Sequence, residues 1–120
     1  MNNTVLVIED DRGLQQTIEG ILELEGYDVI LAGDGLEGLQ RLEHRTVDLI
    51  VLDVMLPRMD GFAFADELRR RGMHSVIPIL VLTADGRARE KAERIGAQAY
   101  LTKPFDLVEL LHEVSQLIHP

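Results

Sequence analysis

The stretch that decides the fold class is Leu49-Ile50-Val51-Leu52-Asp53-Val54-Met55-Leu56-Pro57, in which an aliphatic run meets an aspartate and a proline-containing loop. An apolar run of this length without polar alternation is typical of a strand buried on both faces of a parallel sheet. The segment therefore predicts a buried strand that delivers a carboxylate to the edge of the sheet.

Similar runs lie on both sides of this segment. We interpret four of them as further strands: Val5–Ile8, Val29–Ala32, Ile79–Leu82 and the more polar Ala99–Thr102, which we expect at an edge. Helical patterns alternate with them, with apolar stripes that begin at Leu14, Leu36, Phe62 and Leu107 and a short, charged, exposed helix over Arg87–Ile95. Five such βα units predict an α/β protein with a parallel sheet and helices on both faces.

Composition limits the class of protein further. A chain of 120 residues with 46% hydrophobic composition suits one compact domain, residues 1–120. The absence of cysteine excludes disulfides, thiolate metal sites and cysteine nucleophiles. No apolar run approaches the ~20 residues that span a bilayer, and we expect a cytoplasmic protein. The net charge of -9 argues against direct binding of nucleic acid or an anionic membrane.

Polar residues gather where the predicted strands end, which is where open α/β sheets bind ligands. These residues are Glu9-Asp10-Asp11, Asp53, Thr83-Ala84 and Lys103-Pro104. Crowded carboxylates repel one another unless a cation joins them, and Mg²⁺ commonly binds carboxylates together with a substrate phosphate. A lysine and a hydroxyl can bind phosphate oxygens, and a carboxylate can itself be the nucleophile. The edge of the sheet therefore predicts phosphoryl transfer.

The same residues carry a family resemblance. Glu9-Asp10, Asp53, Thr83-Ala84 and Lys103-Pro104-Phe105 resemble the receiver domain of two-component response regulators, and the loop 53–61 is similar to the family's phosphorylation-site loop throughout. The resemblance runs from the first strand to the last helix. It implies a CheY-like, flavodoxin-like (βα)5 three-layer sandwich with sheet order 2-1-3-4-5. It also implies a signalling switch, not an enzyme, that assists only its own phosphorylation and dephosphorylation.

The resemblance assigns the reacting residues and the metal. Asp53 is implied to accept a phosphoryl group from a sensor histidine kinase or a phosphotransfer protein. Mg²⁺, for which Mn²⁺ can substitute, is implied to bind Asp10, Asp53 and the backbone carbonyl of Met55. Glu9 is implied to act on the ion through water. The side chain of Met55 is expected to overhang the site.

The resemblance also assigns the switch and its partners. Lys103 and Thr83 are implied to bind the phosphoryl group, and Tyr100 to move with Thr83. A cis peptide bond is implied before Pro104. The surface of the fourth helix, fifth strand and fifth helix is then expected to control an output domain or a partner protein.

A phosphorylation-dependent homodimer is compatible with this surface. The DNA-binding branch of the family often carries paired acids just before the fifth-strand tyrosine, where this chain has Gln98 and Ala99. This departure argues against a dimer that uses those salt bridges, although Lys91 remains as a basic partner.

Other interpretations stay open for these residues. A strand-end aspartate can cap a turn, a lysine is usually solvated, and Tyr100 suits an edge strand. Asp11 and Asp106 are predicted helix N-caps, and Arg69-Arg70-Arg71 a solvated helix end.

Three other functions compete with the receiver. A haloacid-dehalogenase-type phosphatase needs a second aspartate where Met55 stands, and a flavodoxin-like FMN carrier needs a phosphate loop where Glu9-Asp10-Asp11 would repel phosphate. A pseudo-receiver that serves only for interaction disagrees with the intact acidic set.

Overall fold

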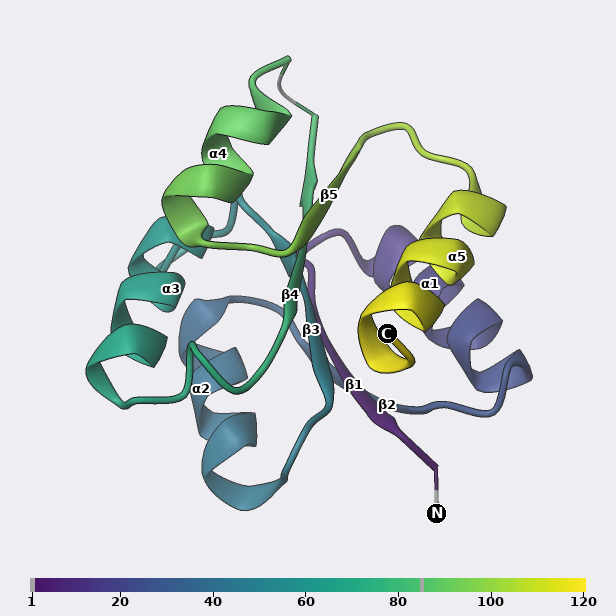
Figure 1. The fold of residues 1–120 in the computed structure, drawn as a ribbon, viewed down its shortest axis with the longest axis horizontal. Coiled ribbons are helices and arrows are strands. Elements are labelled where there is room, and N and C mark those ends of the chain that lie inside the picture. Colours follow the sequence, from purple (N-terminus) through teal and green to yellow (C-terminus); the bar gives the residue numbers. More distant parts are fainter. Residues whose placement is uncertain (1, 85) are drawn as a thin grey trace.

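A computed structural model describes residues 2–84 and 86–120 of the chain. The elements are β1 (Thr4–Ile8), α1 (Arg12–Leu24), β2 (Asp28–Ala32), α2 (Gly35–His44), β3 (Leu49–Asp53), α3 (Gly61–Arg70), β4 (Ile79–Thr83), α4 (Ala88–Ile95), β5 (Ala99–Thr102) and α5 (Leu107–Ile118). The strands form one parallel five-stranded sheet in the order β2-β1-β3-β4-β5. Helices α1 and α5 cover one face, and α2, α3 and α4 cover the other (Figure 1). The predicted three-layer architecture is confirmed.

The three central strands, β1, β3 and β4, are buried at every position. This result confirms the interpretation of their apolar runs. The expectation that the run Val29–Ala32 is equally buried is wrong, because Val29 and Leu31 are only half-buried. The reason is that β2 pairs with β1 alone and lies at an edge of the sheet. The more polar β5 lies at the other edge, as predicted.

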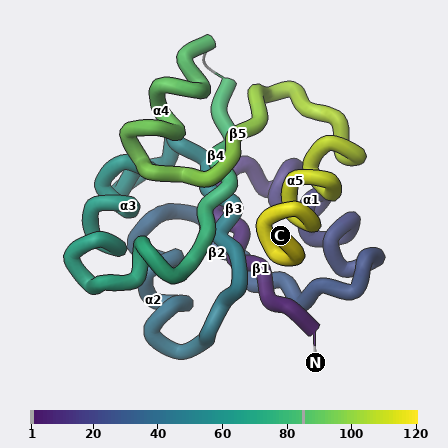
Figure 2. The backbone as a smooth tube through the Cα atoms, viewed as in Figure 1, coloured from purple at the N-terminus to yellow at the C-terminus, as the bar shows by residue number. Residues whose placement is uncertain are grey.

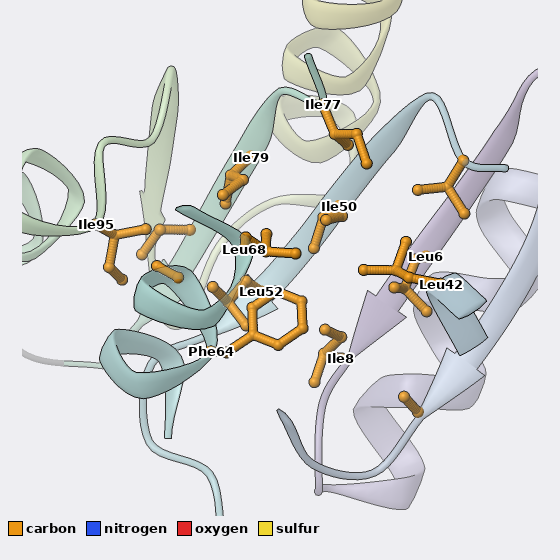
Figure 3. Close-up of a cluster of buried hydrophobic side chains, with 14 of the residues drawn as sticks. Leu6, Ile8, Leu42, Ile50, Leu52, Phe64, Leu68, Ile77, Ile79 and Ile95 are labelled. Carbon is orange, nitrogen blue, oxygen red and sulfur yellow. The ribbon is translucent and has the colours of Figure 1, made fainter. Parts of the chain in front are cut away.

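The hydrophobic core has two halves because side chains of a strand alternate between the two faces of a sheet. One half packs against α1 and α5, which are distant in sequence but lie side by side (Figure 2). The other half contains the fully buried Phe64 of α3, together with Ile8 and Leu52 (Figure 3). A Cβ at Gly38 would lie 2.6 Å from Ile8 Cδ1 and 3.2 Å from Phe64 Cε1. Glycine at this position therefore lets α2 approach the sheet.

Side-chain caps fix where most helices begin. The N-caps Asp11, Asp34, Asp60 and Asp106 each accept a hydrogen bond from a backbone amide in the first turn. The predicted caps at Asp11 and Asp106 are thereby confirmed. Among the helices of the described residues, none combines the length and apolar character that crossing a membrane requires.

Helix α4 differs from its prediction as an exposed helix. Ala88, Ala92 and Ile95 are buried, so only its outer face meets solvent. Its C-terminal end is held by α3, because Arg69 Nη2 donates to the carbonyl oxygen of Ile95 at 2.7 Å and to that of Arg94 at 3.0 Å. Interpreting Arg69 as a purely solvated residue is therefore wrong, since it caps the neighbouring helix.

Candidate functional site

Three carboxylates meet at the carboxyl edge of the sheet. One oxygen from each of Glu9, Asp10 and Asp53 lies within 4.8 Å of the others. Glu9 follows β1 and Asp53 ends β3, and the pairing of Ile8 with Leu52 makes these two strand ends neighbours. Glu9 is 1% exposed and Asp53 is 4% exposed, whereas Asp10 faces solvent. No second group of this kind occurs among residues 2–84 and 86–120.

Lys103 brings a positive charge to this cluster. Its Nζ lies 2.7 Å from Glu9 Oε1 and 3.1 Å from Asp53 Oδ2. The residue follows β5, where its amide donates to the Thr83 carbonyl at 2.8 Å, and its peptide bond to Pro104 is cis, as the resemblance implies. The ammonium thus joins the two buried carboxylates and offsets part of their repulsion.

Burial and charge act on this cluster in opposite directions. Burial raises the pKa of Glu9 and outweighs the lowering by the Lys103 ammonium and the Asp11 amide. Burial alone would lower the pKa of Lys103, but the hydrogen bond to Glu9 and the charge of Asp53 raise it above its ordinary value. Lys103 therefore stays protonated at neutral pH. Its single positive charge does not balance the charge of the three carboxylates in the cluster.

Both carboxylate oxygens of Asp53 have partners. Oδ2 accepts from Lys103, and Oδ1 accepts from the Met55 amide at 3.2 Å. The Met55 residue is 69% exposed, so its side chain extends into solvent beside the cluster. The carboxylate is therefore fixed in orientation, with an ammonium on one oxygen and a backbone amide on the other.

The two predicted switch residues lie further along the sheet. Thr83 ends β4, where Asp53 pairs with the preceding Leu82, and it is fully buried. Tyr100 lies in β5 and is 41% exposed. It lines a groove of about 490 Å³ between α4, β5 and α5. The structure therefore brings Glu9, Asp10, Asp53 and Lys103 together, places Thr83 at the adjacent strand end, and leaves Tyr100 on the neighbouring surface.

Two charged residues near the site, Asp34 and Arg58, were not predicted from the sequence. Asp34 lies just beyond β2 and is 5% exposed, and its Oδ2 accepts from Arg58 Nε at 2.7 Å. An aspartate before the apolar stripe of α2 is an N-cap signal that could have identified Asp34. No local signal marks Arg58 as its partner, because the two residues are 24 positions apart.

This sheet, with carboxylates and a lysine at its carboxyl edge, defines a signalling protein of the CheY-like α/β class. The family model for the response regulator receiver domain matches residues 5–115, and the chain belongs to that family. Receiver domains are phosphoacceptors in signalling and not classical enzymes.

Known relatives agree with this assignment. The chain is 42% identical over 116 residues to the DNA-binding dual master transcriptional regulator RpaA of Synechocystis, covering 95% of this chain and 48% of that protein. It is 40% identical over 120 residues to the alkaline phosphatase synthesis transcriptional regulatory protein PhoP of Bacillus subtilis, covering 98% of this chain and 49% of that protein. The chain thus spans about half the length of these relatives.

A solved structure is similar over its whole length. The receiver domain of the Pseudomonas aeruginosa sensor histidine kinase PA1611 matches with a TM-score of 0.90 at 32% identity, covering 100% of both chains. That structure holds a magnesium ion coordinated in its active-site cleft.

Proposed function

We propose that residues 1–120 form a single receiver domain that accepts a phosphoryl group on Asp53 in a Mg²⁺-dependent reaction. The donor is a sensor histidine kinase or a phosphotransfer protein. The observation that carries the proposal is the cluster of Glu9, Asp10 and Asp53 with the Lys103 ammonium 3.1 Å from Asp53. A carboxylate that is buried, oriented and paired with a cation suits a nucleophile that becomes an acyl phosphate, which is a mixed anhydride.

The donor set fits a divalent cation that prefers oxygen ligands. Three carboxylates share one ammonium, so the cluster keeps an excess of negative charge that Mg²⁺ would neutralise. We assign Asp10, Asp53 and the Met55 carbonyl as direct ligands and Glu9 as a ligand through water, with Mn²⁺ as a substitute. When bound, the ion supplies charge neutralisation for the transferring phosphoryl group.

The chain's own residues perform the transfer. An Asp53 oxygen forms a bond to phosphorus while the bond between phosphorus and the donor histidine nitrogen breaks. The Met55 amide orients Asp53 through Oδ1, and Lys103 is close enough to neutralise the oxygens of the new phosphoryl group. The Thr83 hydroxyl donates a hydrogen bond to an oxygen of the same phosphoryl group. The same residues assist later hydrolysis, so the chain promotes its own dephosphorylation.

Phosphorylation would then change the adjacent surface. The modification adds roughly 1.5 to 2 negative charges, which attract Thr83 and Lys103 and move the loops after β4 and β5. Tyr100 follows, and the surface of α4, β5 and α5 changes its population of conformers. We assign this surface to an output domain or a protein partner in transcription regulation, or to a phosphorylation-dependent homodimer. The chain acts in the cytoplasm and itself binds neither nucleic acid nor membrane.

The phosphoacceptor can be tested with acetyl phosphate. Intact mass measured after incubation with acetyl phosphate and Mg²⁺ should show one added phosphoryl group, and EDTA should prevent it. Asp53→Asn should remove the adduct, whereas Asp60→Asn should keep it, because Asp60 caps α3 and asparagine is an equally good cap. An adduct that survives Asp53→Asn, or no adduct on the wild-type chain, would contradict the proposal.

A further inference from the structure

The loop between β3 and α3 is held by residues outside the carboxylate cluster. Its two ends are joined because the Gly61 amide donates to the Val54 carbonyl at 2.9 Å. Its middle packs on the start of α2, where the Gly35 amide donates to the Met59 carbonyl at 3.2 Å. A Cβ at Gly35 would lie 2.7 Å from that carbonyl oxygen, so only glycine allows this approach. The loop after Asp53 is therefore docked on a neighbouring helix.

Arg58 turns the chain within this loop. Its φ of 61° is the only positive φ of a non-glycine residue among residues 2–84 and 86–120. The left-handed region is unfavourable for a residue with a Cβ, so an arginine there needs a contact that holds it. Asp34 supplies that contact, because its Oδ2 accepts from Arg58 Nε at 2.7 Å and also from Nη2.

Asp34 is well placed to hold the arginine. Its side chain is 7% exposed, whereas that of Arg58 is 62% exposed. The second oxygen, Oδ1, accepts from the Glu37 amide at 2.9 Å at the start of α2. Burial acts to raise the pKa of Asp34, but the Glu37 amide and the Arg58 guanidinium together lower it below its ordinary value. One buried carboxylate therefore joins the start of α2 to the loop that follows Asp53.

We propose that Asp34 and Arg58 are positioning residues for the phosphorylation of Asp53, an inference that rests on the proposed function. Neither residue belongs to the carboxylate cluster. Their ion pair keeps Arg58 left-handed and so sets the course of the loop that carries Met55, three positions earlier. The amide of Met55 orients Asp53, and its carbonyl is the main-chain ligand assigned to the cation. Breaking the pair should therefore weaken the binding of Mg²⁺.

Three variants separate charge from backbone conformation. Asp34→Asn keeps the N-cap of α2 but removes the charge that binds Arg58. Arg58→Ala removes the charge and disfavours the left-handed turn, whereas Arg58→Gly removes the charge and accepts that turn. The measurements are the Mg²⁺ concentration that half-saturates phosphorylation by acetyl phosphate, the Mg²⁺ dissociation constant from NMR titration without phosphodonor, and exchange of the Gly35 amide in metal-free protein.

We expect the Mg²⁺ constants of Asp34→Asn and Arg58→Ala to rise about tenfold, as for other residues that orient metal ligands. The rise should be smaller for Arg58→Gly, and the Gly35 amide should exchange faster in the first two variants. Arg70→Ala is the matched control, because it breaks a 2.6 Å pair with Glu67 on the outer face of α3 and should leave the constants unchanged.

Three outcomes are informative, and they distinguish failure of this inference from failure of the proposed function. Variants of Asp34 and Arg58 with Mg²⁺ constants within twofold of wild type would overturn the inference alone. An Arg58→Gly variant as impaired as Arg58→Ala would overturn the role given to the left-handed turn. A wild-type chain that takes up no phosphoryl group would overturn the proposed function, and this inference with it.

Discussion

Replacing Asp10 by asparagine should stabilise the metal-free protein. The carboxylate oxygens of Glu9, Asp10 and Asp53 lie within 4.8 Å of one another, and Lys103 contacts only the two buried members. Two unit charges separated by 4.8 Å repel by ~3.5 kcal/mol at an effective dielectric constant of 20 and by ~0.9 kcal/mol in bulk water. Because Asp10 is exposed, the repulsion that acts on its carboxylate lies toward the lower of these two energies.

We therefore expect Asp10→Asn to raise the free energy of unfolding by about 1–2 kcal/mol in low salt with EDTA. For a domain of 120 residues this corresponds to a rise in Tm of roughly 4–8 °C. Wild-type protein should gain ~1.4 kcal/mol when Mg²⁺ reaches ten times its dissociation constant. The variant should gain little, because it has lost a charged ligand. At one hundred times the dissociation constant the wild-type gain reaches ~2.7 kcal/mol, so the wild type should then be the more stable protein.

Thermal unfolding across a Mg²⁺ series measures both effects. Asp11→Asn is the control, since it makes the same change of charge one residue further on and keeps the cap that accepts from the Leu14 amide. This control should respond to Mg²⁺ like the wild type. If Asp10→Asn is less stable than wild type in EDTA, or gains as much stability from Mg²⁺ as Asp11→Asn, the argument from repulsion is refuted.

Three further predictions concern packing, pH and the end of α4. Gly38→Ala should cost about 1–3 kcal/mol in urea unfolding because its Cβ would lie 2.6 Å from Ile8 Cδ1, whereas Gly20→Ala, with nothing within 4 Å, should gain up to ~1 kcal/mol; equal effects would contradict this packing. The lowered pKa of Asp34 means that its ionised form stabilises the fold above its ordinary value of 3.8 and that this stability is lost as pH falls through the folded pKa. The stability difference between wild type and Asp34→Asn should therefore shrink below about pH 4, and a difference that stays constant down to pH 2 would be inconsistent with this assignment. Arg69→Ala should speed amide exchange in α4 but not in α1, because it removes the guanidinium that donates to the Arg94 and Ile95 carbonyls, and uniform acceleration would point to global destabilisation instead.

Much of the site was predictable from sequence because its residues stand directly after strands. An aliphatic run such as residues 49–52 predicts its own burial, and parallel strands bring their carboxyl ends to one edge. The positions of Glu9, Asp53 and Lys103 in the cluster therefore follow from local pattern and the topology of βα units. The burial of β2 was mispredicted because an apolar run does not show whether a strand has one neighbour or two.

The sequence by itself thus determined the α/β class, the order of elements, the aspartate caps of α1 and α5 and the residues presented at the carboxyl edge. These features depend on residues that are close together in the sequence, so they follow from the spacing of residues along the chain. Only the tertiary structure decided that Asp34 holds Arg58, that Arg69 caps α4 and that Gly38 meets Ile8. Each of those contacts joins residues from different elements. Their distances depend on how the layers pack, which no local pattern specifies.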